Sequence, residues 1–290
     1  MELIAVLEAE PALWLTTTLI LGLLVGSFLN VVILRLPPML EYRWRENCRE
    51  FLQQPASDNA PPPGLVSPRS CCPNCGHSIG ALENVPVLSY IALQGKCKGC
   101  HAPISIRYPA IELLTGGISL LVAWHFGVSW EAIGALGLSW ALIALSFIDI
   151  DHQLLPDSIT LPGIWAGLLF SLFAKLSDPI SSILGAVLGY LALWSVYQLF
   201  RLLTGKEGMG YGDFKLLAMI GAWTGWQALP GTILLSSLVG ALLGGTMLLV
   251  GDREREQPIP FGPYLAVAGW LMLVWGEHIN TGYLRFAGLA

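Results

Sequence analysis

Residues 12–34 read ALWLTTTLILGLLVGSFLNVVIL, a stretch without a single charged side chain. A helix needs roughly 20 mostly apolar residues to cross the hydrocarbon core of a bilayer, so this stretch is long enough for one membrane span. The first ten residues, MELIAVLEAE, contain three glutamates and no lysine or arginine, unlike the basic start of a cleavable signal peptide. We therefore expect the stretch to stay in the protein as a membrane anchor.

The rest of the chain has the same apolar character. Hydrophobic residues make up 54% of the 290 residues and charged residues only 12%, about half the roughly 25% of a soluble domain. The sequence predicts an all-α polytopic membrane protein with about eight transmembrane helices in a lipid bilayer. The seven further spans are expected near residues 108–126, 129–148, 157–175, 180–203, 210–228, 230–250 and 261–279. The net charge of −5 gives no indication of nucleic-acid binding.

Basic residues are divided unevenly between the two sides that eight spans define. Of the 15 lysines and arginines, only Lys175 and Arg285 fall on one side, which leaves thirteen on the other. Because basic loops stay in the cytoplasm, we expect the 36–107 loop and the 251–259 loop to be cytoplasmic and both termini to face outward. No internal repeat is apparent along the chain.

The 36–107 loop contains two cysteine pairs, Cys72-Pro-Asn-Cys75 and Cys97-Lys-Gly-Cys100. Four thiolates match the tetrahedral preference of structural zinc, and a cytoplasmic location disfavours disulfides. A small polar insert also has little core of its own, so a bound ion would stabilise it. We therefore predict a structural Zn²⁺ site; the alternative is redox pairs or unmetallated cysteines.

Other potential ligands lie close to these pairs in the sequence. Cys71 directly precedes the first pair and could compete as a ligand, whereas Cys48 is left over. His77 and His101 follow the two pairs, but four cysteines already complete a tetrahedral site. Both histidines are therefore interpreted as bystanders.

Two acidic segments lie where predicted spans meet the cytoplasmic face. One span ends in SFIDIDHQLLPD, which contains Asp149, Asp151 and Asp157, and another begins in GMGYGDFKL with Asp213. An ionisable residue in an apolar membrane segment is costly and marks a functional candidate. Two carboxyls from different helices cannot both ionise when brought together, so they would share one proton, a state that suits hydrolysis of a peptide bond.

The pattern makes Asp149 and Asp213 candidates for a catalytic pair, but other interpretations stay open. Asp157 follows Pro156 and is typical of a cap on the next helix, while Asp151 stays unassigned. The glycines before Asp213 leave the backbone open to the close approach of a peptide strand. A proton-coupled transporter could also place carboxylates near helix ends, although the repeated halves of such proteins are not apparent.

Several motifs together resemble the type IV prepilin peptidases, which are membrane aspartic proteases of the GxGD type. Asp149 within FIDIDHQLLPD and Asp213 within GMGYGDFKLL look like the two aspartate motifs of that family. The paired CxxC motifs are similar to the family as well. So are GSFLNVVILRLP at 26–37, RYPAIELL at 107–114 and PFGPYLA at 260–266, in order along nearly the whole chain.

The resemblance is closest to the bifunctional members, and it implies an enzyme of the bacterial inner membrane whose active site faces the cytoplasm. Such an enzyme cuts the leader from type IV prepilins and type II secretion pseudopilins, then N-methylates the new N-terminus with S-adenosylmethionine. Carried over, the resemblance makes Asp149 and Asp213 the catalytic pair and the four paired cysteines the metal ligands. No glycine-rich loop of a methyltransferase is recognisable, so the residues that bind the methyl donor stay unassigned.

These expectations divide the chain into a first transmembrane helix at 1–35, a cytoplasmic zinc-binding domain associated with methyl transfer at 36–107, and a membrane aspartic peptidase domain at 108–290. Glu112, about one turn inside a span, either contacts the positive amino terminus of a cleaved pilin or pairs with Arg107 or a hydroxyl. Two other function classes stay open: a proton-coupled transporter, and a scaffold for pilus or secretion assembly, which would not need both aspartates.

Overall fold

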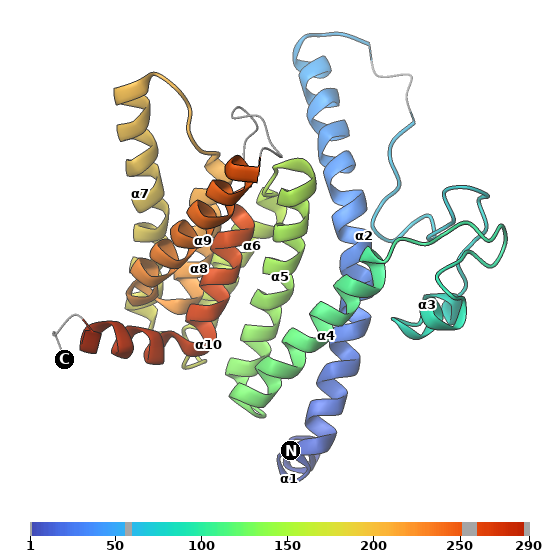
Figure 1. The fold of residues 1–290 in the computed structure, drawn as a ribbon, viewed down its shortest axis with the longest axis horizontal. Coiled ribbons are helices and arrows are strands. Elements are labelled where there is room, and N and C mark those ends of the chain that lie inside the picture. The colour runs from blue at the N-terminus through green and yellow to red at the C-terminus, as the bar shows by residue number, and fades with distance from the viewer. Residues whose placement is uncertain (1, 56–59, 251–259, 287–290) are drawn as a thin grey trace. The chain divides into compact units, whose positions relative to one another are not determined.

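The computed structural model describes residues 2–55, 60–250 and 260–286, and every regular element within these ranges is a helix. The predicted all-α class is therefore confirmed for the described residues. The predicted cytoplasmic loop at 251–259 lies outside them. The chain forms two compact units, Met1–Val128 and Ser129–Ala290 (Figure 1).

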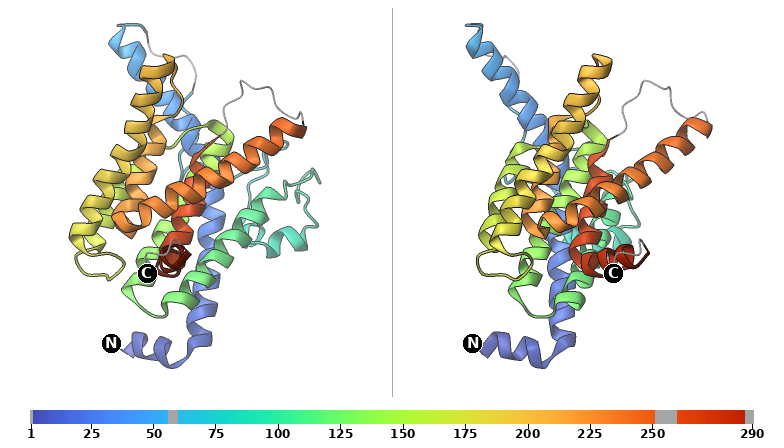
Figure 2. Two further views of the ribbon diagram at one scale, coloured as in Figure 1. Left: turned by 60° about the vertical axis from the view of Figure 1, so that its left-hand side comes forward. Right: turned by 90° about the vertical axis from the view of Figure 1, so that its left-hand side faces the viewer.

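The first unit is built on two long helices that pack side by side. Its elements are α1 (Glu2–Ala9), α2 (Pro11–Phe51), the 3₁₀ turn η1 (Ala81–Asn84), α3 (Leu88–Ala92) and α4 (Arg107–Phe126). Residues 60–106 lie beside α4 and the middle of α2 in every view, and not beyond the ends of these helices (Figures 1 and 2).

Helix α2 is longer than the sequence suggested. The span was expected to end near residue 34, but the helix continues through Pro37 and Pro38 to Phe51, a length of about 60 Å. Each proline removes one amide donor and crowds the carbonyl four residues before it. The residues that follow nevertheless support a helix through pairs such as Glu41 with Arg45, at 3.6 Å in an i,i+4 spacing. Roughly half of α2 therefore extends past a bilayer core of about 30 Å.

Helices α2 and α4 run antiparallel and touch through glycine. The indole of Trp14 donates to the carbonyl of Ala123 at 3.1 Å near one end, and the Asn30 amide donates to the carbonyl of Tyr108 at 3.1 Å near the other. Between them, a Cβ atom on Gly26 would lie 2.8 Å from the Cα atom of Glu112. Only small residues allow such backbone proximity, which drives helix association in lipid.

The second unit surrounds one short central helix. Its elements are α5 (Trp130–His152), α6 (Asp157–Phe170), α7 (Pro179–Thr204), α8 (Tyr211–Thr224), the 3₁₀ turn η2 (Trp226–Ala228), α9 (Leu229–Val250) and α10 (Gly262–Phe286). Helix α8 packs against α6, α7 and α10, and its residues 216–223 are all buried. Gly185 of α7 and Gly221 of α8 bring these two helix backbones into direct contact.

The eight predicted spans are not confirmed. A helix occupies each of the eight predicted stretches, but only α2, α4, α5 and α7 are long and apolar enough within the described residues to cross a membrane. Helices α6 and α8 have 14 residues each, which gives about 21 Å, less than a bilayer core. Hydropathy alone joined these short helices to the apolar turns that follow them, which is why the sequence overestimated their length.

The contact between α2 and α4 can be tested with two glycines that differ only in their surroundings. We expect Gly26→Ala to lower the free energy of unfolding by about 1–3 kcal/mol, because the added methyl group meets helix backbone that cannot move aside. Gly117→Ala should be neutral, because a Cβ atom there meets nothing within 4 Å. Thermal unfolding of both variants in detergent measures the difference, and equal melting temperatures would contradict this packing.

Candidate active site and candidate metal centre

Asp149 lies in the last turn of α5 and is buried, with 6% of its surface exposed. The backbone amide of Gly262, the first residue of α10, donates to its Oδ2 atom at 3.0 Å. A Cβ atom on Gly262 would lie 2.7 Å from that same oxygen, so a larger residue could not approach the carboxylate in this way. The start of α10 therefore fixes the orientation of the Asp149 side chain.

Asp213 lies in the first turn of α8 and is also buried, with 8% of its surface exposed. The position before it, Gly212, packs against Leu155 so closely that a Cβ atom would lie 2.8 Å from the Leu155 Cβ. Leu155 also contacts Gly262, beside Asp149. Leu155 thereby packs beside both carboxyls, which lie at the same end of the second unit.

The neighbouring aspartates differ in burial and in partners. Asp151, two positions after Asp149, is exposed, since residues at i and i+2 on a helix point to different faces. Asp157 was interpreted as a helix cap, and this was wrong: Pro156 occupies the cap position of α6. The Asp157 carboxylate instead accepts two hydrogen bonds from Lys215 of α8, at 2.6 and 2.8 Å.

A second site is formed by the four paired cysteines, whose sulfur atoms all lie within 4.8 Å of one another. The Sγ atoms of Cys72 and Cys100 are 3.8 Å apart, and those of Cys75 and Cys97 are 4.0 Å apart. A tetrahedral zinc with Zn–S bonds of about 2.3 Å requires S–S separations of roughly 3.8 Å. The cluster therefore has the dimensions of a Cys₄ metal site.

The electrostatics of the cluster also favour a cation. Backbone hydrogen bonds from Cys75 and Asn74 lower the pKa of the Cys72 thiol to about 7. A backbone hydrogen bond from His77 lowers the pKa of Cys75. The nearby thiol of Cys100, desolvation and the thiol of Cys72 together outweigh it and raise this pKa to about 12. Four neighbouring thiolates repel one another, so full deprotonation needs a positive ion among them.

The two cysteine pairs belong to a short repeat that the sequence analysis missed. In residues 70–79 and 95–104 the amide after the second cysteine donates to the carbonyl of the first, Gly76 to Cys72 and His101 to Cys97, each at 2.9 Å. Isolated bridges pair Cys71 with Ser78 and Lys96 with Pro103 at equivalent places. The turn residues Gly76 and His101 both have positive φ, at 71° and 58°. The sequence signal for this repeat was the equal placement of the cysteine pairs in residues 70–75, SCCPNC, and residues 95–100, GKCKGC.

His77, one of the two histidines interpreted as bystanders, makes a different contact. His77 bonds with its Nε2 atom to Glu83 Oε2 at 2.9 Å, and Lys98 approaches Glu83 Oε1 at 3.1 Å. The hydrogen bond from His77 and then that from Lys98 lower the pKa of Glu83 to about 2. Glu83 therefore joins the two repeats, and neither Cys71 nor a histidine belongs to the metal-ligand cluster among the described residues.

Comparison with known proteins places this geometry in a family. The model of the bacterial peptidase A24 N-terminal domain matches residues 20–126, and that of the type IV leader peptidase family matches residues 136–245. A prepilin leader peptidase/N-methyltransferase of Stutzerimonas stutzeri is 58% identical, covering 98% of both chains. A relative of the same name from Pseudomonas aeruginosa is 56% identical over 99% of both chains. Another from Aeromonas hydrophila is 54% identical over 94% of this chain and 95% of the relative.

The chain belongs to the type IV leader peptidase family. The resemblance inferred from the motifs is thereby confirmed, as is the expectation of an enzyme with peptidase and N-methyltransferase activities, the two activities that the relatives' names print. No solved structure gives a significant match to the chain.

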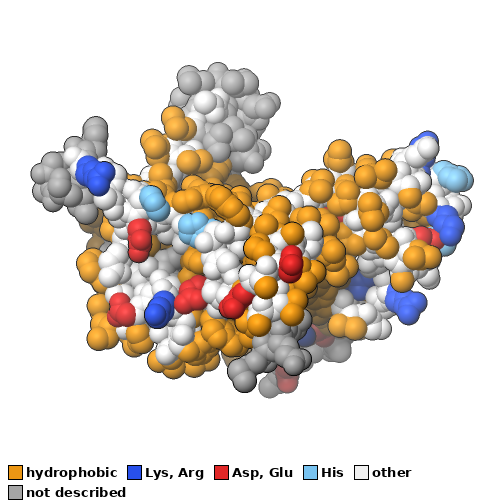
Figure 3. Space-filling view, turned by 90° about the horizontal axis from the view of Figure 1, so that it is seen from below, with side chains coloured by type: hydrophobic (Ala, Val, Ile, Leu, Met, Phe, Trp, Pro, Cys, Tyr) orange, Lys and Arg blue, Asp and Glu red, His pale blue; other side chains and the backbone are white. Residues whose placement is uncertain are grey.

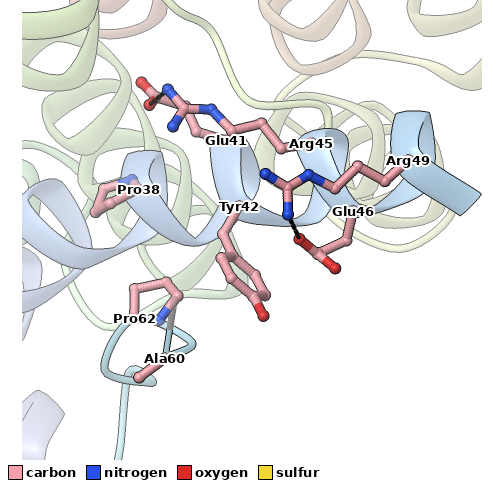
Figure 4. A pocket seen from close by; sticks show the side chains of 8 residues that line it. All are labelled: Pro38, Glu41, Tyr42, Arg45, Glu46, Arg49, Ala60 and Pro62. Atoms are coloured by element: carbon pink, nitrogen blue, oxygen red, sulfur yellow. Dashed lines mark ion pairs between the residues drawn. The ribbon is translucent and has the colours of Figure 1, made fainter. Parts of the chain in front are cut away.

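In this family member, a cavity of the first unit is lined by residues outside the cysteine cluster. It has a volume of about 270 Å³ and lies open to solvent between the extension of α2 and residues 60–62 (Figure 4). Its lining residues are Pro38, Glu41, Tyr42, Arg45, Glu46, Arg49, Ala60 and Pro62. The charges in its wall are paired with each other, Arg45 with Glu41 at 3.6 Å and Arg49 with Glu46 at 3.7 Å.

The assignment of metal ligands can be tested with adjacent cysteines. We expect Cys72→Ser to lose the bound metal, because a tetrahedral thiolate site needs all four sulfur atoms. Cys71→Ser should keep it, since Cys71 is outside the cluster although it is the next residue in the chain. Elemental analysis of the purified variants gives the metal content per chain. Loss of metal in both variants, or in neither, would contradict this ligand set.

Proposed function

We propose that this protein removes the leader peptide from type IV prepilins at the cytoplasmic face of the bacterial inner membrane, with Asp149 and Asp213 as the catalytic pair. The observation that carries the proposal is the burial of both carboxyls at one end of the second unit, with a backbone amide fixed on Asp149 at 3.0 Å. Type II secretion pseudopilins are proposed as substrates of the same site.

The proposed chemistry is hydrolysis by two aspartates that share one proton. The ionised carboxylate takes a proton from a water molecule, and the resulting hydroxide attacks the scissile carbonyl carbon while the protonated carboxyl donates to the carbonyl oxygen. The hydrogen bond from Gly262 holds one carboxylate in position for this exchange, so no reorientation is needed when the substrate binds.

The division of labour within the chain follows the same proposal. Residues 108–290 would form the aspartic peptidase domain and residues 36–107 the cytoplasmic zinc-binding domain associated with methyl transfer, after the helix at 1–35. The cysteine cluster would hold a structural Zn²⁺ ion, which supplies folding free energy to a segment with a small core. Methyl transfer from S-adenosylmethionine rests on the names of the relatives.

We expect Asp149→Asn and Asp213→Asn each to abolish cleavage of a prepilin, because the amide keeps the shape of the carboxyl but cannot exchange a proton. The double variant should be no worse than either single variant, since the residues act as one unit. Asp151→Asn is the matched control, because Asp151 is exposed on the same helix end. Loss of the leader on a gel is the measurement.

Activity of both Asp149→Asn and Asp213→Asn at the wild-type rate would exclude the aspartic-protease mechanism and leave the transporter or the scaffold. Loss of activity in Asp151→Asn together with an active Asp149→Asn would assign the catalytic role to Asp151 in place of Asp149.

Methyl transfer should be separable from cleavage. Hydrolysis by an aspartate pair uses no methyl donor, so we expect purified protein without S-adenosylmethionine to release a cleaved, unmethylated pilin. Addition of the donor should yield a product that is heavier by one methyl group, which mass spectrometry of the new N-terminus detects. An unmethylated product in the presence of the donor would remove the second activity from this chain.

A further inference from the structure

Glu112 lies inside the membrane helix α4, five residues after its start at Arg107, or about 7 Å along the axis. It is buried, with 8% of its surface exposed. Its Oε2 atom accepts a hydrogen bond at 2.8 Å from the backbone amide of Val87, the residue that directly precedes α3. This bond fixes the start of α3 at a depth well below the start of α4.

The chain reaches this depth through a strained turn. Val87 has φ 62° and ψ −47°, and the amide of Leu88 donates to the carbonyl of Pro86 at 2.6 Å. This is a γ-turn of the rare positive-φ kind, which a β-branched residue adopts only where its surroundings impose it. Such strain persists where neighbouring contacts over-determine it, and here the contact with Glu112 does so.

The segment presents apolar side chains outward at that depth. Leu88 and Ile91, three positions apart on one face of α3, are each 66% exposed. Ile106 just before α4 is 73% exposed, and Leu113 on α4, next to Glu112, is 56% exposed. Seen from the side toward which α4 descends, the part of the molecule that holds residues 60–106 shows hydrophobic side chains with basic ones near its edge (Figure 3).

The backbone amides of this segment form hydrogen bonds within the protein, as an apolar environment requires. The amides of Val87, Leu88, Ser89, Ile91, Leu93, Gln94, Gly95 and Lys96 all donate hydrogen bonds within the protein. Hydrocarbon supplies no hydrogen-bond partners, so backbone at membrane depth must be satisfied internally. Without Glu112, the amide of Val87 would need a water molecule as its hydrogen-bond acceptor.

We propose that residues 85–95 form an interfacial membrane segment, with Leu88 and Ile91 inserted among lipid acyl chains beside α4. The occupant of this apolar face is lipid because the face is continuous with the exposed side of a membrane helix at the same depth. Lys96 follows directly and would contact lipid headgroups, while the metal cluster stays at the membrane surface. The buried carboxylate of Glu112 is thus a positioning residue for this segment.

The test uses the full chain in lipid nanodiscs, with a benzophenone amino acid at single positions and mass spectrometry of the products after irradiation. Ile91→benzoylphenylalanine should yield as much lipid adduct as Leu113→benzoylphenylalanine on α4. Val66→benzoylphenylalanine should yield none, although Val66 is 88% exposed. Arg35, a charged residue just after the apolar stretch of α2, donates hydrogen bonds to Gly64 and Pro68 at 2.7 and 2.8 Å and so keeps the segment around Val66 out of the lipid. Absence of a lipid adduct at position 91 would overturn the proposal.

A second arm separates lipid from a bound substrate. Added prepilin should leave the lipid adduct at position 91 unchanged, whereas replacement of that adduct by a crosslink to prepilin would overturn the proposal in favour of a substrate groove. Glu112→Ala should reduce the lipid adduct at position 91, and Glu112→Gln should restore it because the amide oxygen still accepts from Val87. An undiminished adduct in Glu112→Ala would remove the positioning role. Neither arm depends on Asp149 and Asp213 being catalytic.

Discussion

Direct contact between helix backbones is the constraint on which both units depend. Lipid is as apolar as the side chains that face it, so helices in a membrane gain little from burying hydrophobic surface and associate instead through close packing. Gly26 brings α2 against α4 at Glu112, and Gly185 brings α7 against α8 at Gly221. Because these contacts are between backbones, they fix helix positions more rigidly than contacts between flexible side chains would.

Within these rigid units, the buried carboxylates have fixed hydrogen-bond partners. Asp149 and Glu112 lie in different units, yet each carboxylate receives a backbone amide, from Gly262 at 3.0 Å and from Val87 at 2.8 Å. A buried carboxylate without a partner would be strongly destabilising. One amide belongs to a glycine at a helix start and the other to a strained turn. The start of α10 thereby fixes the Asp149 carboxylate, whereas the Glu112 carboxylate fixes the strained turn at Val87.

The segment between α2 and α4 has too small a hydrophobic core to be stabilised by burial alone. It has few buried apolar residues, and Cys97 is among the few buried side chains in it. Two equivalent turns bring four sulfur atoms to the separations of a tetrahedral metal site, and Glu83 joins the turns through His77 and Lys98. A metal ion would replace the missing core, while Glu112 attaches the segment to the helices of the membrane.

The sequence by itself determined the membrane class, the helical fold, the two cysteine pairs that cluster and the family, because each depends on local composition or spacing. It could not determine that α6 and α8 are too short to span, since apolar residues in a turn look the same as those in a helix. Burial of Asp149 and exposure of Asp151 followed only from the packing of α5 against α10. The partners of Asp157 and Glu112, which are 58 and 25 residues away, were also decided by tertiary structure, because hydrogen bonds between distant segments leave no periodic pattern in a sequence.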